Sequence, residues 1–233
     1  TSPELEDLVD QVSIDEPVIV NEGARDALGN PLPRIAAIDC GIKYNILRSL
    51  CCQFEVVWCP PDISFETLQG FSITALFCSN GPGDPAHPGK ATNARYTLAQ
   101  AVASGIPVMG ICLGMQLLFA ASPEGNTPLL GIFDADCETF IPAQGRSVPH
   151  MGWNRLSKQQ DHLLLAGVDE GAHVYFVHSY FVPVTAQTIA TTNYGDDFTA
   201  IVAENNFMGC QFHPEKSGLA GAQILRNFLE MPS

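Results

Sequence analysis

The stretch Pro107-Val-Met-Gly-Ile-Cys-Leu-Gly-Met-Gln-Leu-Leu118 decides the fold predicted for this chain. The apolar run 106–111 predicts a buried strand and 115–121 predicts a helix, so Cys112 falls on the turn between them. Glycines at 110 and 114 permit a sharp, strained turn, as at the nucleophile elbow of hydrolases. Free N–H groups and the helix dipole there would favour a thiolate. The pattern predicts a nucleophile at Cys112, with a buried core cysteine as the simpler alternative.

The segment Gln211-Phe-His-Pro-Glu215 offers this thiol a base and a group to orient the base. It follows a strand-like run, 208–212, that can end beside the elbow in the folded chain. A nucleophile and its base must be neighbours in space, not in sequence. A single histidine is more often structural, so the prediction depends on the pairing of His213 with Glu215.

The composition indicates one domain with a short extension. The chain has 233 residues, of which 46% are hydrophobic, and a mean hydropathy of +0.11, which is enough for a substantial core. No apolar run approaches the ~18 residues that span a bilayer, and the first residues lack the pattern of a signal peptide. We therefore expect a cytoplasmic protein that does not contact a membrane. The formal charge of −14 argues against a nucleic-acid partner, because such a partner requires a basic patch.

The cysteines do not form a metal-binding pattern. Eight of them are scattered at positions 40, 51, 52, 59, 78, 112, 137 and 210. None forms a CxxC pair or has the spacing of a zinc site, so we expect neither a metal nor a cofactor. Apart from Cys112, they are expected to be small buried hydrophobes in a reducing compartment.

Alternating strand and helix patterns predict an α/β fold with an open, mostly parallel sheet and flanking helices. Residues 1–33 are expected to form an irregular lead-in segment, and residues 34–233 the domain itself. In the first part, strands are expected at 35–39, 54–59 and 73–78, and helices at 44–52 and 91–104. Later strands are expected at 152–156, 174–177, 188–193, 199–203 and 208–212, before a last helix at 219–229.

Ligands of an open α/β sheet collect outside the carboxyl ends of its strands. Three candidate segments lie there, namely Ser79-Asn-Gly-Pro-Gly-Asp-Pro85, the Cys112 elbow and the turn before His213. The glycine turn is either a tight connection or a source of oxyanion donors, with the N–H groups of Gly81 and Gly83 acting beside that of Leu113. It is not a phosphate loop, because Gly-x-x-x-x-Gly-Lys-Ser/Thr is absent.

Three motifs together resemble those of class I glutamine amidotransferases, the triad type of glutaminase domain. They are Gly110-Ile-Cys-Leu-Gly-Met-Gln116, Ser79-Asn-Gly-Pro-Gly-Asp84 and His213-Pro-Glu215. The resemblance covers residues 34–233 and implies a flavodoxin-like fold.

The resemblance also implies a reaction. Cys112 would attack the side-chain amide of L-glutamine, while His213 shuttles the proton and Glu215 holds the imidazole. Ammonia would leave first, and water would then release glutamate from a thioester on the cysteine. The residues that correspond to the family's substrate-binding positions are Gln116, Ser179 and Tyr180.

The two halves resemble different members of this family. Asp39-Cys-Gly-Ile-Lys-Tyr-Asn-Ile-Leu-Arg48 is similar to the glutaminase part of carbamoyl phosphate synthase. Pro149-His-Met-Gly-Trp-Asn154 is similar to the glutaminase subunit of imidazole glycerol phosphate synthase. The chain departs from the first pattern at Met115, where histidine is usual, and from the second at Asn80-Gly-Pro-Gly83, where Pro-Gly-Val-Gly is usual. A hybrid or an unusual natural lineage would each explain this mosaic.

The second resemblance implies an ammonia-accepting synthase as the partner, a cyclase barrel. The residues that would face it are Met151, Trp153, Asn154 and Lys216. Trp153 has a core aromatic as its alternative, and the large subunit of carbamoyl phosphate synthase is the alternative partner. Two other classes of protein stay open, a non-catalytic regulatory module and a γ-glutamyl peptidase. The retained cysteine and histidine argue against the module, and Gln116 argues against the peptidase.

Overall fold

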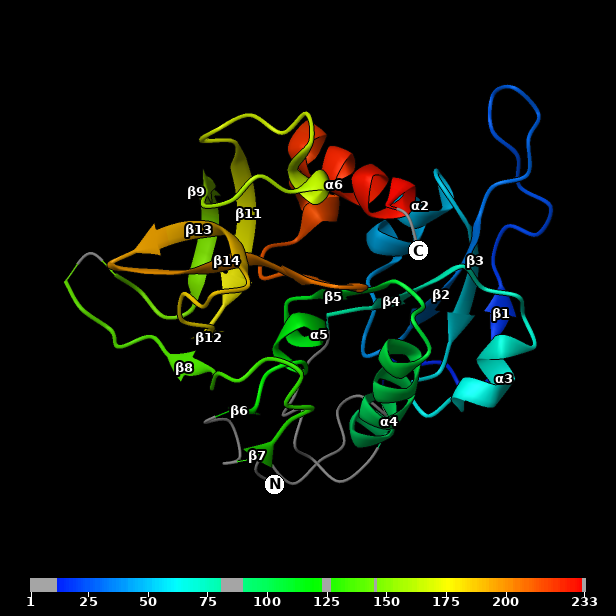
Figure 1. Ribbon diagram of the computed structural model, residues 1–233, viewed down its shortest axis with the longest axis horizontal. Coiled ribbons are helices and arrows are strands. Elements are labelled where there is room, and N and C mark those ends of the chain that lie inside the picture. The colour runs from blue at the N-terminus through cyan, green and yellow to red at the C-terminus, as the bar shows by residue number, and fades with distance from the viewer. Residues whose placement is uncertain (1–11, 81–89, 123–126, 145, 232–233) are drawn as a thin grey trace. The chain divides into compact units, whose positions relative to one another are not determined.

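The computed structural model describes residues 12–80, 90–122, 127–144 and 146–231 (Figure 1). The chain divides into two compact units, Thr1–Val108 and Met109–Ser233. The boundary falls inside strand β5 (Val108–Ile111), immediately before the predicted elbow. The expected separation of a lead-in segment at residue 33 stays a prediction.

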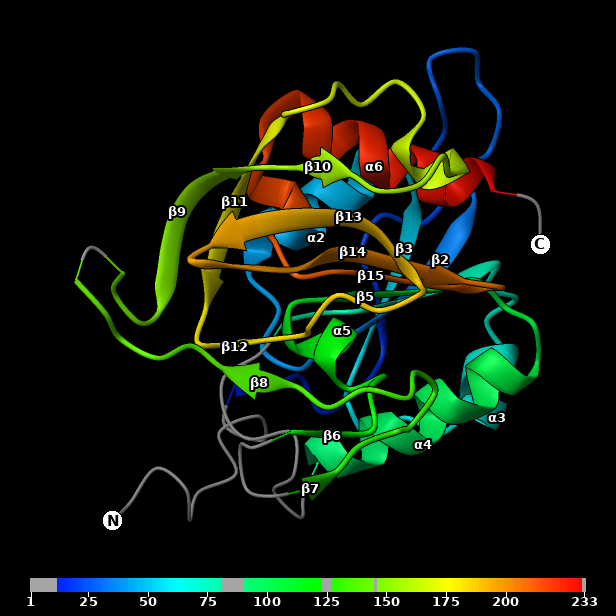
Figure 2. The ribbon, with the colours of Figure 1, turned by 60° about the vertical axis from the view of Figure 1, so that its left-hand side comes forward.

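The first unit is built on parallel strands. Strand β2 (Arg34–Ile38) lies between β3 (Glu55–Cys59) and β4 (Ala75–Cys78) and is parallel to both. The short strand β1 (Val18–Ile19) pairs antiparallel with β3. Helix α2 (Tyr44–Cys51) covers one face of this sheet, and α3 (Phe65–Gln69) and α4 (Lys90–Ala103) cover the other (Figure 2). Because both faces are covered, β2 is apolar from Ile35 to Ile38, each at most 1% exposed.

The sequence pattern located these elements well. The expected strands and helices at 35–39, 44–52, 54–59, 73–78 and 91–104 are confirmed, each end lying within two residues of the observed one. Helix α2 buries one stripe, formed by Ile46, Leu47 and Leu50. Helix α3 was not predicted, because its five residues are too few to show a helical period. Its start is fixed by Ser64, whose hydroxyl accepts a hydrogen bond from the Thr67 N–H at 3.1 Å.

The second unit combines a mainly antiparallel ladder with a separate ribbon. The ladder runs β5, β15 (Phe207–Cys210), β14 (Asp196–Glu204), β13 (Thr188–Tyr194) and β10 (Ser157–Lys158). Pairs β10–β13, β13–β14 and β14–β15 are antiparallel. Strands β9 (His150–Arg155) and β11 (His173–His178) form the ribbon (Figure 2), and helix α6 (Gly218–Glu230) lies against β11. The remaining elements are α5 (Leu113–Gln116), β6 (Ala121–Ser122), β7 (Thr127–Pro128), β8 (Glu138–Thr139), β12 (Tyr180–Phe181) and the short 3-10 helices η2 (Leu163–Leu165) and η3 (Pro214–Lys216).

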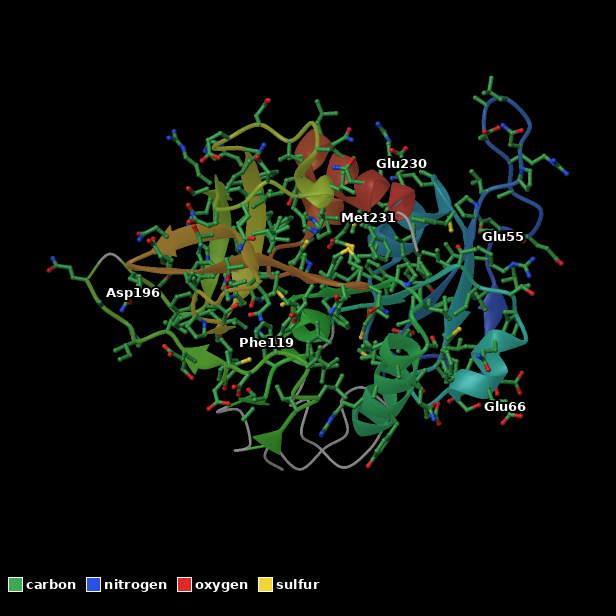
Figure 3. All side chains as sticks on the ribbon, in the orientation of Figure 1. Glu55, Glu66, Phe119, Asp196, Glu230 and Met231 are labelled. Atoms are coloured by element: carbon green, nitrogen blue, oxygen red, sulfur yellow. The ribbon has the colours of Figure 1, made fainter. Side chains whose placement is uncertain are left out.

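The predicted helix at 115–121 is wrong in its extent. Helix α5 covers only Leu113–Gln116, and the chain then turns into β6. The apolar residues that suggested a longer helix are core residues of an irregular segment. Phe119 is fully buried and packs on Phe133 at 5.0 Å between ring centroids; Figure 3 labels it close to α5. The later strands and the last helix that the sequence predicted all fall on observed elements.

A side-chain contact fastens the tip of the β13–β14 hairpin. Figure 3 labels Asp196 at this turn, where its carboxylate lies 3.0 Å from Nη1 of Arg146. The same guanidinium donates to the carbonyl of Ile141 at 3.0 Å through Nε. The contacts tie the segment before β9 to the hairpin.

Candidate active site

Cys112 occupies the strained turn that the glycines predicted. Its backbone angles are φ 52° and ψ −106°, in a region that a residue with a side chain rarely adopts. Its N–H donates to the carbonyl of Cys210 at 2.7 Å, which joins the elbow to β15. A Cβ on Gly110 would overlap the backbone of Gly114, so only glycine permits this approach of strand and helix. The elbow geometry is present, and the chemical role of Cys112 stays a prediction.

The single turn of α5 changes the expected electrostatics of the elbow. Four residues carry too small a macrodipole for the contribution that the sequence suggested. The first N–H groups of the turn still lack partners within the helix, and that of buried Leu113 follows Cys112 directly. Individual N–H groups, not a long helix dipole, are therefore available to a thiolate or an oxyanion.

Gln211 is a neighbour of the thiol that the sequence analysis did not single out. Its Nε2 lies 3.6 Å from Sγ of Cys112, and its side chain is fully buried. Its Oε1 accepts a hydrogen bond from Nε2 of Gln116 at 3.0 Å, which fixes the orientation of the amide. Gln211 directly follows β15, and no local sequence pattern marks it, because its contact with Cys112 joins residues 99 positions apart.

His213 and Glu215 form the predicted pair. His213 Nδ1 lies 2.9 Å from Oε1 of Glu215, and both side chains are 1% exposed. A carboxylate only accepts hydrogen bonds, so Nδ1 carries the proton and Nε2 is left as a base. Glu215 lies on η3, and its buried Oε2 has no partner among the described residues.

Strand β11 borders both the thiol and this pair. Sγ of Cys112 lies 3.9 Å from the carbonyl oxygen of Val177, and the His213 N–H donates to the carbonyl of Tyr175 at 2.9 Å. These two carbonyls are two residues apart on one strand, on the same side of it. The elbow and His213 therefore meet the same stretch of β11.

The expected substrate-binding residues also lie together. Nε2 of Gln116 donates to the carbonyl of Tyr180 at 3.1 Å, and Gln116 is 4% exposed. The carbonyl of Ser179 accepts the N–H of Phe140 at 3.2 Å. Gln116 thus links the elbow to the 179–180 segment. The expected oxyanion donors Gly81 and Gly83 lie outside the described residues.

Three of the four expected partner-facing residues are split between the two faces of β9, and Lys216 lies on η3. Met151 and Trp153 are 62% and 57% exposed, so Trp153 is not a core aromatic. Trp153 packs on Tyr175 at 5.9 Å between ring centroids, and Nζ of Lys216 lies 5.2 Å from the centroid of the same ring. Asn154 points to the other face, where it donates to the carbonyl of Asn193 at 2.9 Å.

The described part of the chain shows neither a metal-binding cluster nor a membrane-spanning helix. Within the described ranges, no cluster of three or more His, Cys, Asp or Glu side chains is arranged to hold a metal ion. Helices in the same ranges are each too short or too polar to cross a bilayer.

Comparison with known proteins identifies the family. Residues 36–231 match the family model of class I glutamine amidotransferases. The chain belongs to this family, which confirms the class of enzyme predicted from the sequence.

Individual relatives show a likeness to HisH subunits. The imidazole glycerol phosphate synthase subunit HisH of Pectobacterium atrosepticum is 55% identical over 126 residues, which are 54% of this chain and 64% of the relative. The HisH subunit of Escherichia coli K12 is 56% identical over the same length and the same shares. The chain therefore spans less than two thirds of the length of these relatives. The resemblance to carbamoyl phosphate synthase stays a prediction.

A solved structure supports the fold. A Thermoplasma acidophilum protein described as a GMP synthase subunit matches with a TM-score of 0.65 at 19% identity, over 85% of this chain and 92% of that one. At this identity the likeness concerns the fold alone. It confirms the predicted flavodoxin-like α/β fold.

Proposed function

We propose that this protein is a glutaminase that hydrolyses L-glutamine to glutamate and ammonia through Cys112, His213 and Glu215. The observation that carries the proposal is the arrangement of polar side chains at the thiol and at His213. The Gln211 amide faces Sγ at 3.6 Å. The Glu215 carboxylate fixes the His213 tautomer that leaves Nε2 basic, at 2.9 Å from Nδ1.

Each step of the reaction uses these groups. Nε2 of His213 takes the proton of Cys112, and the thiolate attacks Cδ of glutamine. The Leu113 N–H, with donors expected from Gly81 and Gly83, holds the oxyanion. When the tetrahedral intermediate collapses, the C–N bond breaks and His213 returns the proton to the departing ammonia. Water, deprotonated by His213, then attacks the thioester, and the thiolate leaves as glutamate forms.

Glutamine is bound beside the elbow by Gln116, Ser179 and Tyr180. The hydrogen bond from Gln116 to the Tyr180 carbonyl supports this assignment, because it brings the elbow turn and the 179–180 segment to one place. The free cysteines support a reducing, cytoplasmic setting.

The ammonia passes to a synthase partner of the imidazole glycerol phosphate synthase type. Two observations support this partner, namely the identity of 55% to a HisH protein and the exposure of Met151 and Trp153. Exposed aromatic and Met side chains are enriched in protein interfaces. The large subunit of carbamoyl phosphate synthase is the alternative, on the motif of residues 39–48.

The test is glutamate release by the purified chain alone, with the cyclase barrel, and with the large subunit of carbamoyl phosphate synthase. Cys112→Ala should abolish release, and Cys52→Ala, at an exposed cysteine, should leave it unchanged. No release with either synthase partner would contradict the proposal. Faster cleavage of a γ-glutamyl dipeptide than of glutamine would indicate a peptidase instead.

A further inference from the structure

Two buried histidines outside the proposed triad form a chain of contacts that ends at the glutamine site. His150 on β9 and His178 on β11 are register partners and are 3% and 5% exposed. His150 Nδ1 lies 3.0 Å from His178 Nε2, and His178 Nδ1 lies 2.7 Å from the carbonyl oxygen of Tyr180. At the other end, Nδ2 of Asn154 lies 3.4 Å from His150 Nε2.

The donors and acceptors in this series of contacts allow only one assignment of the ring protons. The Tyr180 carbonyl can only accept, so Nδ1 of His178 carries a proton. The Nε2 of a neutral His178 is then an acceptor, and Nδ1 of His150 must donate to it. The Nε2 of His150 is left to accept from the Asn154 amide. Both rings are therefore Nδ1–H tautomers.

The surroundings of the two rings keep them neutral. His150 is stacked between Tyr194 and Phe176, at 3.9 and 4.9 Å between ring centroids. Burial lowers the pKa of His150 to about 4. Burial also lowers the pKa of His178 to about 3; the hydrogen bond to the Tyr180 carbonyl opposes this shift, and charge on His150 or His213 adds to it. Near neutral pH neither ring is charged.

We propose that His178 is a positioning residue for the glutamine site. The Tyr180 carbonyl accepts from both His178 Nδ1 at 2.7 Å and Gln116 Nε2 at 3.1 Å. Gln116 in turn holds the amide of Gln211 that faces the thiol. His178 thus orients the peptide on which Gln116 depends, without touching the reacting atoms. The inference rests on the proposed function, since that function assigns Gln116 and Tyr180 to substrate binding.

The tautomers can be read directly in the full chain. Long-range 1H–15N correlation spectra at pH 7 distinguish protonated from unprotonated ring nitrogens. We expect Nδ1–H for both His150 and His178, which is the minor tautomer of free histidine. An Nε2–H tautomer at either ring would overturn the proposal, and this measurement needs no variant that could fail to fold.

Two substitutions separate the two nitrogens of His178. In His178→Asn, the amide can take the place of Nδ1 and keep the donor to Tyr180. In His178→Gln, the longer amide takes the place of Nε2 and keeps the contact with His150 but loses that donor. We expect His178→Gln to raise KM for glutamine about tenfold, the effect of one lost hydrogen bond, with a smaller change in kcat. His178→Asn should stay within about threefold of the unmodified chain.

If His178 had a merely structural role, both substitutions would change KM for glutamine equally. Equal KM values in His178→Asn and His178→Gln would therefore overturn the inference, whatever their melting temperatures. Failure of the proposed function looks different, since the unmodified chain with its synthase partner would then release no glutamate. The Kd for glutamine, measured by calorimetry with Cys112→Ala added to each variant, gives the same comparison without turnover.

Discussion

Nε2 of Gln211 lies 3.6 Å from Sγ of Cys112, with its orientation fixed by the amide of Gln116. A hydrogen-bond donor at this position stabilises a thiolate more than a thiol. The thiol therefore has a specific partner on the segment that leads to His213. This contact makes the reactivity of Cys112 depend on a residue that does not take part in proton transfer.

Gln211→Leu should make Cys112 less reactive. Loss of a hydrogen bond to a charged group corresponds to about a tenfold lower rate of alkylation at pH 7. The rate is followed by mass spectrometry of the Cys112 peptide during treatment with iodoacetamide. Exposed Cys52 in the same sample is the internal reference, and its rate should not change. An unchanged rate at Cys112 would show that the contact does not stabilise the thiolate.

Glu215→Gln should lower turnover with little loss of stability. The substitution removes the charge that holds the imidazole, and an orienting carboxylate of this kind contributes on the order of a hundredfold or more. Oε2 has no partner among the described residues, so the new amide group breaks no recorded hydrogen bond. Glutamate release and thermal unfolding are measured beside Glu170→Gln, at an exposed carboxylate that accepts from the Lys158 N–H. Equal turnover in the two variants would remove Glu215 from the triad.

Gly110→Ala should disrupt the elbow. The added Cβ would overlap the backbone of Gly114, which cannot move without moving Cys112. In Gly209→Ala the atoms nearest to the Cβ would instead be side-chain carbons of Met115 and Val202, which can adjust more than the backbone can. We expect a loss of unfolding free energy of about 3 kcal/mol for Gly110→Ala, and a smaller loss for Gly209→Ala, both measured by urea unfolding. Equal losses would mean that the strand and helix of the elbow can separate at little cost.

The fold was predictable where burial produces a regular pattern of apolar residues in the sequence. Strand β2 is apolar on both faces because both are covered, and α2 carries a clear apolar stripe. The extent of α5 was not predictable, because an apolar run has the same appearance in a helix and in an irregular core segment. Phe119 reaches the core from such a segment.

The candidate site was predictable where its residues are close in sequence. The elbow glycines and the spacing of His213 and Glu215 are local patterns. The roles of Gln211 and His178 depend on contacts between distant segments, which no local pattern shows. The placement of Asn154 was predictable, because strand alternation puts position 154 on the face of β9 opposite positions 151 and 153. The sequence alone therefore held a reason to separate Asn154 from Trp153.

Trp153→Ala should weaken binding of the synthase partner. Its side chain is 57% exposed and is supported by Tyr175, as expected of an interface anchor. Truncation of such an anchor costs about 2 kcal/mol, or roughly a thirtyfold rise in Kd. Calorimetry with the cyclase barrel measures this, and Leu163→Ala, at a residue that is 60% exposed on η2, is the matched control. Unchanged affinity for the barrel would exclude this face of β9 as the docking surface.

Stability should fall as the pH drops below neutrality because His150 and His178 stay neutral in the fold. Burial lowers their pKa values to about 4 and about 3, whereas histidine in an unfolded chain titrates near ~6.5. Below that pH the unfolded state binds protons that the native state does not. The free energy of unfolding then falls by about 1.4 kcal/mol per pH unit for each such histidine. Above pH ~6.5 the two rings contribute no pH dependence.

Urea unfolding at pH 7 and pH 5 measures this dependence. In His150→Gln one of the two neutral rings is removed, so the loss between the two pH values should shrink by about 2 kcal/mol. His173→Gln, at an exposed histidine of β11, is the matched control and should keep the full dependence. The same loss in His150→Gln as in the unmodified chain would mean that His150 gains its proton in the fold above pH 5. The Nδ1–H chain from Asn154 to Tyr180 would then be broken under mildly acidic conditions, because a doubly protonated His150 cannot accept from Asn154.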